Sequence, residues 1–68
     1  MHTAELRVAV AEFVSRMTEM RVWLDSQRYE PVVFRYINAG SAVLVRVDFA
    51  AEDEAHAFAA QFGGRILG

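Results

Sequence analysis

The chain has 68 residues and a formal net charge of -2 at pH 7, which is not the basic profile of a general nucleic-acid binder. It contains no Cys, which excludes disulfides and thiolate metal sites, and its two His residues, His2 and His56, are too few for a zinc site built on imidazoles. A single domain of this size buries only about 60% of the surface of its unfolded chain, yet 54% of the residues are hydrophobic.

The composition also bears on location and ligands. No apolar run approaches the roughly 20 residues of a membrane span, and residues 1–5 lack the positive and apolar regions of a signal peptide. We therefore expect a cytoplasmic protein that does not bind a membrane. All cations are arginines, which either serve bidentate recognition of anions or reflect the codon usage of a GC-rich genome.

One long row of apolar residues dominates the first third of the chain. Its members are three or four residues apart and predict one helix over residues 3–27, ~37 Å long. Thr3 is the expected N-cap and Glu5 complements the helix dipole. The row consists of Leu6, Val10, Phe13, Met17, Met20 and Leu24.

Residues 31–49 predict a β-hairpin, because apolar residues alternate along two segments that Asn, Gly and Ser separate. A two-residue loop at Ala39 and Gly40 would pair Tyr36 with Val43 and keep the apolar side chains on one face. A three-residue loop with a bulge at Gly40 would slip the pairing by one residue. We expect the first arrangement, since the buried face determines the register.

Residues 52–62 predict a second helix with one apolar face, which Gly63 ends in the left-handed conformation. Residues 65–67 form an extended tail that could add an edge strand. The expected fold is therefore a single α+β domain over residues 1–68, with the long helix first and the order α-β-β-α-β.

Four segments resemble small bacterial α+β proteins to which no function is assigned. The resemblance covers about two thirds of the chain and implies no activity, cofactor or catalytic residue. The segments are Met20-Arg21-Val22-Trp23-Leu24-Asp25, Arg28-Tyr29-Glu30-Pro31, Glu54-Ala55 with Ala57-Phe58-Ala59, and Phe62-Gly63-Gly64.

The apolar row favours a homodimer. Strands of about seven residues span only roughly 23 Å, so the first helix would extend beyond its own sheet, and a two-stranded sheet is marginal alone. We therefore expect a non-enzymatic, self-associating interaction or regulatory module, with an unidentified protein as a further partner. The residues expected at the dimer interface or core are Leu6, Val10, Phe13, Met17, Met20, Trp23 and Leu24.

An alternative function rests on Arg35 and Arg46, which fall diagonally on the sheet face opposite the core. This face could bind a small anionic ligand or nucleic acid. In the competing interpretation, Asp48 and Glu side chains neutralise the arginines, and the neighbouring apolar residues contact the sheet of a partner. Nucleic acid is not the expected partner, because Phe34 and Tyr36 point away from this face and cannot stack on bases.

Two further groups have an ordinary explanation. Trp23 could form an aromatic pocket with Tyr29 and Phe34, but such residues pack more often in a core or dimer interface. An enzyme using Glu52, Asp53 or His56 is the least favoured function, since a charged first helical turn explains these residues. The sequence predicts no catalytic, cofactor-binding or metal-binding residue.

Overall fold

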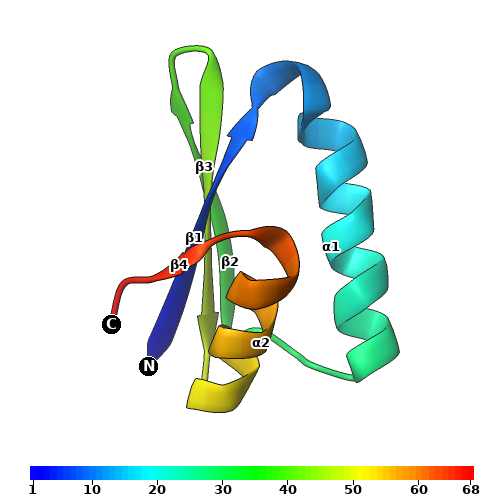
Figure 1. The fold of residues 1–68 in the computed structure, drawn as a ribbon, viewed down its shortest axis with the longest axis vertical. Helices are drawn as coiled ribbons and strands as arrows, with labels where there is room; N and C mark the ends of the chain where they lie inside the picture. Colours follow the sequence, from blue (N-terminus) through cyan, green and yellow to red (C-terminus); the bar gives the residue numbers. More distant parts are fainter.

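The computed structural model describes residues 1–68 and contains one four-stranded antiparallel sheet and two α-helices (Figure 1). Both helices lie on the same side of the sheet, which leaves the other face open. The strand order β2-β3-β1-β4 and the chain order β-α-β-β-α-β are those of the split βαβ, or ferredoxin-like, arrangement. The elements are β1 (His2–Ala9), a 3₁₀ turn (Val10–Glu12), α1 (Phe13–Gln27), β2 (Val33–Ala39), β3 (Ala42–Phe49), α2 (Glu52–Phe62) and β4 (Arg65–Ile66).

The α+β class is confirmed, but the helix-first order is wrong because the chain begins with a strand. Residues 2–9 form β1, which lies between β3 and β4 and pairs with β3 along its whole length. Ala4, Leu6 and Val8 are buried toward the helices, while the residues between them face the other side. This alternation has the period of a strand, and the backbone hydrogen bonds offered by two neighbouring strands outweigh any local helical preference.

The first α-helix is consequently much shorter than expected. Its 15 residues span about 22 Å, so the apolar row is divided between a strand, a turn and a helix. Leu6, Met20 and Leu24 are buried in this single copy, and Val10 is 50% exposed. Phe13, Met17 and Trp23 are partly buried against the core. The overlong helical stripe that favoured a second copy does not exist.

The hairpin is present, with a register that differs by two residues from the expected one. Its two-residue loop is Gly40-Ser41, so Tyr36 pairs with Val45. Gly40 has a φ of 70°, as the first loop residue of a type II′ turn requires. A shift of two residues keeps each side chain on its expected face, but it places Arg35 directly opposite Arg46 instead of diagonally.

The second helix and the extended tail fold as predicted. The second helix, α2, spans Glu52–Phe62 and ends at Gly63, whose φ is 72°. The tail forms β4 beside β1. Backbone hydrogen bonds between Thr3 and the last two residues continue this pairing, so the two chain ends lie side by side (Figure 1).

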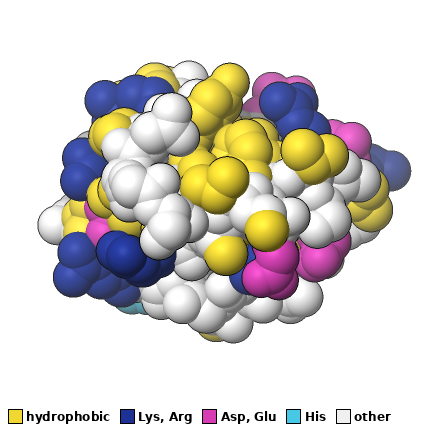
Figure 2. Space-filling model, turned by 90° about the horizontal axis from the view of Figure 1, so that it is seen from above, with side chains coloured by type: hydrophobic (Ala, Val, Ile, Leu, Met, Phe, Trp, Pro, Cys, Tyr) yellow, Lys and Arg dark blue, Asp and Glu magenta, His cyan; other side chains and the backbone are white.

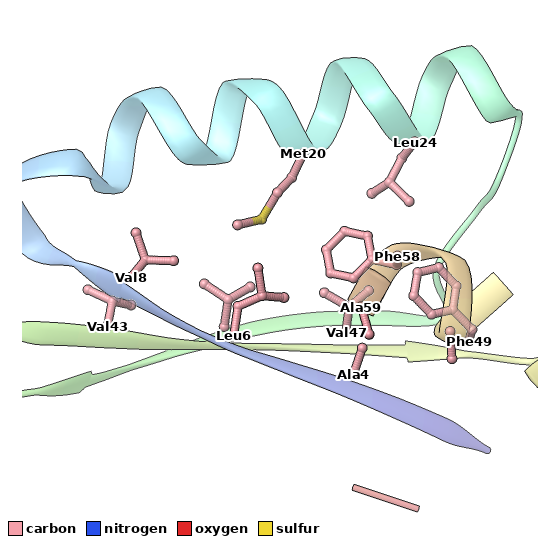
Figure 3. Close-up of a cluster of buried hydrophobic side chains, with 12 residues drawn as sticks. Ala4, Leu6, Val8, Met20, Leu24, Val43, Val47, Phe49, Phe58 and Ala59 are labelled. Atoms are coloured by element: carbon pink, nitrogen blue, oxygen red, sulfur yellow. The ribbon is translucent and has the colours of Figure 1, made fainter. Parts of the chain in front are cut away.

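The core lies between the helices and the sheet (Figure 3). Met20 and Leu24 point down from α1 toward β1 and β3, and Phe58 fills the space beside them from α2. The 12 residues of the buried cluster are Ala4, Leu6, Val8, Met20, Leu24, Val43, Val45, Val47, Phe49, Ala55, Phe58 and Ala59. Neither α-helix has the length and apolar character needed to cross a membrane.

Candidate binding surfaces on the sheet

The face of the sheet that the helices leave open carries its side chains in three cross-strand rows. The central row crosses all four strands as Arg35, Arg46, Glu5 and Arg65. A row of Ile37, Leu44 and Arg7 lies on one side of it. On the other side lie Val33, Asp48 and Thr3, with Leu67 bonded to Thr3 through its backbone.

Glu5 is the centre of the charged row. Its side chain is only 6% exposed and accepts hydrogen bonds from Arg46 Nε at 2.8 Å and from Arg65 Nη2 at 2.9 Å. The hydrogen bond from Arg46, and then that from Arg65, lowers the pKa of Glu5, although burial opposes this shift. Glu5 therefore stays ionised and holds two guanidinium groups in place.

Arg35 has a much looser attachment. Its Nη2 lies 3.4 Å from Asp48 Oδ2, and its side chain is 59% exposed. Asp48 also accepts a hydrogen bond from the Thr3 hydroxyl through its other oxygen. Like charges directly opposite each other on neighbouring strands are destabilising. The carboxylates of Asp48 and Glu5 reduce this repulsion between Arg35 and Arg46.

Arg7 has no carboxylate partner and lines a hollow of about 320 Å³ at the β4 side of the open face. Glu5, Leu44, Gly63, Gly64 and Arg65 complete its walls. Gly64 packs so closely on β1 that an added Cβ would lie 2.6 Å from the Glu5 carbonyl oxygen. A side chain at position 64 would therefore not fit against β1.

Charge is unevenly distributed between the two sides of the molecule. The open face carries four of the seven arginines but only two of the nine acidic residues. Arginine side chains gather at the left of Figure 2, the side on which the sheet lies in Figure 1. The open face is therefore positive in a chain that is negative overall.

The edge strand β2 is a second distinctive surface. It has seven residues and no strand neighbour beyond β3, and most of its side chains are exposed. Val33 is 37%, Tyr36 61% and Ile37 47% exposed, so apolar atoms reach solvent on both faces of this edge. It has no proline or bulge, and Arg35 is its one charged residue.

Helix α1 lies above this edge. The rings of Phe13 and Tyr36 are 5.3 Å apart, and the Arg21 guanidinium lies 6.0 Å from the centre of the Phe34 ring. Val14 is seven residues before Arg21 and therefore on the same side of the helix. Its side chain is 79% exposed, which extends the apolar surface of the β2 edge onto the helical layer.

The other predicted groups do not form a comparable site. Trp23 makes an edge contact with Tyr29 but also packs on Phe58 and Phe62, while Phe34 lies beneath Arg21. Trp23 is thus a partly buried contact between the two helices. His56 is exposed on α2, and no group of three or more His, Asp or Glu side chains is placed to hold a metal.

The sequence prediction placed Arg35 and Arg46 correctly on the face opposite the core, but it missed the residues beside them. The expected helix over residues 3–27 includes Glu5 and Arg7, and the sequence pattern indicates no role for Arg65. The sequence signal for a strand is the alternation of Thr3, Glu5 and Arg7 with the apolar residues Ala4, Leu6 and Val8, but Leu6 also fits the helical spacing of the row that follows.

Comparison with protein-family models, with curated proteins and with solved structures finds no match to this chain. Its surfaces are therefore the basis for a functional proposal. The fold and these surfaces define a small α+β sandwich with one open, positively charged sheet face and one open, apolar sheet edge.

Proposed function

We propose that this protein is a non-enzymatic, cytoplasmic interaction module that forms a homodimer by pairing the β2 edges of two copies. The single observation behind the proposal is the exposed β2 edge, with its apolar side chains on both faces. Natural proteins protect such edges with charges, prolines, bulges or covering segments, since an exposed edge pairs readily with another chain. Pairing with a second copy gives this edge the cover that its own chain does not provide.

Symmetry defines the arrangement of the two copies. Antiparallel pairing of identical edge strands requires a two-fold axis perpendicular to the sheet, which turns both open faces to the same side. The product is one eight-stranded sheet, in which the two copies of α1 lie on the same face of the sheet, one on each side of the axis. Tyr36 and Val14, which are highly exposed in one copy, would then be covered by their counterparts.

The size of the chain is compatible with this interface. A stable interface of standard size buries about 800 Å² on each partner. The whole chain exposes 4319 Å², so this area is about a fifth of its surface. The β2 edge and the neighbouring part of α1 would both contribute to this interface area, one from the sheet and one from the helical layer.

The experiment is sedimentation equilibrium on the wild type and on two variants. Ile37→Lys places a charge on the open β2 edge, and Val22→Lys places the same charge on the outer side of α1, where Val22 is 62% exposed. We expect the wild type and Val22→Lys to have twice the chain mass of 7.7 kDa and Ile37→Lys to have a single chain mass. A wild type that stays monomeric at tens of micromolar would refute the proposal.

Amide hydrogen exchange locates the interface. Every second amide of β2 points away from β3, and these amides exchange rapidly in a monomer. We expect their exchange to slow as the protein concentration rises. A dimer in which these amides exchange freely at all concentrations would use another surface, and the β2 assignment would be wrong.

A further inference from the structure

We infer that the open face of the sheet binds an acidic polypeptide segment in extended conformation, with Arg7, Arg35 and Arg46 binding its carboxylates. This inference does not rest on dimerisation, because the face is complete in one copy. It rests on three observations: the charge of the face, the free donors of its arginines, and the aliphatic residues between them.

The charge of the face selects an anionic partner. Four arginines face only two carboxylates there, while the remaining surface carries most of the acidic residues. A second copy meeting the same face would bring like charges together. An acidic segment would instead add negative charge beside the directly opposed Arg35 and Arg46, each of which has one carboxylate partner within the chain.

The arginines keep donors available while their positions are held. Arg46 uses only its Nε toward Glu5, and Arg35 uses only Nη2 toward Asp48. Arg7 makes no side-chain hydrogen bond within the chain. Because Glu5 is buried and fixes Arg46, the free terminal nitrogens of Arg46 lose little freedom when a carboxylate binds.

The residues between the arginines favour a polypeptide over a nucleic acid. Ile37 and Leu44 lie in the row beside Arg35 and Arg46, and Ile37 is 47% exposed. An extended peptide turns every second residue toward this surface, so acidic and apolar residues that alternate at these positions place both kinds of side chain on it. No aromatic residue lies in the three rows, so the face has no platform for stacked bases.

The probe is a peptide of repeating Glu-Ser-Val-Ser units, which turns glutamate and valine to the same face of an extended chain, and binding is measured by isothermal titration calorimetry at low ionic strength. The double variant Arg7→Gln/Arg35→Gln removes two charges from the open face without disturbing the bonds to Glu5. Arg28→Gln, which removes one exposed charge just after the end of α1, is the control. We expect saturable binding by the wild type, unchanged affinity in the control, and a loss of at least about tenfold in the double variant.

Three results would overturn the inference: no saturable binding to the wild type, an equal loss in Arg28→Gln, or tighter binding of a thymidine oligonucleotide of equal charge. The last result would identify a nucleic-acid surface instead. The oligomeric state of each variant is measured in the same buffer. Peptide binding by a monomer would therefore support this inference while refuting the proposed dimer, and the two proposals fail separately.

Discussion

Glu5 connects two arginines of the open face to the centre of the sheet. Its carboxylate is nearly inaccessible to solvent, and both of its oxygens accept hydrogen bonds from guanidinium groups. Arg46 and Arg65 are more exposed than Glu5, so water can hydrogen-bond to the two arginines. Water cannot reach the Glu5 carboxylate in the same way, so this carboxylate depends on its arginine partners. A buried carboxylate with charged partners is therefore both a stabilising and a positioning residue.

Glu5→Gln should lower the free energy of unfolding at pH 7 by about 1–3 kcal/mol, because a neutral amide replaces the charged acceptor of two arginines. The hydrogen bonds from Arg46 and Arg65 lower the pKa of Glu5 from its ordinary value of 4.5. The stabilisation is therefore present above 4.5 and is lost as the pH falls through the lowered pKa. Urea unfolding from pH 7 to well below 4.5 measures both effects.

The control for this prediction is Glu30→Gln, which changes an exposed acid outside the helices and strands that makes no ion pair. We expect it to leave the unfolding free energy almost unchanged and to keep the acid-dependent loss of the wild type. A Glu5→Gln protein with the same acid sensitivity as the wild type would show that other carboxylates cause that loss.

The two helices end in the same backbone conformation with different residues. At the end of α2, Gly63 adopts a φ of 72°, which costs a glycine little. At the end of α1, Arg28 adopts a φ of 60° and its N–H bonds to the last turn. Arg28 is the one non-glycine residue with a positive φ, so the connection from α1 to β2 carries a local strain that α2 avoids.

Arg28→Gly should raise the free energy of unfolding by about 1 kcal/mol, because glycine removes the steric cost of the left-handed conformation. The control is the opposite change at the end of α2, Gly63→Ala, which should lower the free energy of unfolding by a similar amount. Thermal unfolding followed by circular dichroism measures both. A destabilised Arg28→Gly protein would show that the Arg28 side chain contributes more than its backbone conformation costs.

The molecule as a whole has little interior. Its buried cluster comprises 12 residues, and the chain has no Cys with which to form a disulfide. Chains of about this size are marginally stable alone, and association then contributes to folding through mass action. The proposed dimer would therefore affect stability as well as function.

If two copies pair through β2, the Tm of the wild type should rise by about 3–6 °C for each tenfold increase in protein concentration. Ile37→Lys should unfold at a Tm that does not depend on concentration, and Val22→Lys should behave like the wild type. Differential scanning calorimetry over a wide concentration range measures this. A constant wild-type Tm would contradict a dimer that dissociates on unfolding.

The elements from residue 33 onward could be predicted because their signals are local. Alternating apolar residues identify β2 and β3, Gly40 and Gly63 mark the turn and the helix end, and the spacing of Ala55 and Phe58 identifies α2. The same alternation put Arg35 and Arg46 on the face away from the core, since side chains of a strand have a period of two whatever their register.

The first nine residues could not be assigned in this way. Leu6 and Val10 continue the helical spacing of Phe13 and Met17, and Leu6 equally continues the strand spacing of Ala4 and Val8. A short segment that satisfies both periods adopts the one for which the rest of the chain offers hydrogen-bond partners. The local sequence thus set the faces of the hairpin and of α2. The pairing of β1 between β3 and β4, which joins residues far apart in the chain, placed Glu5 among the arginines and left β2 as an open edge.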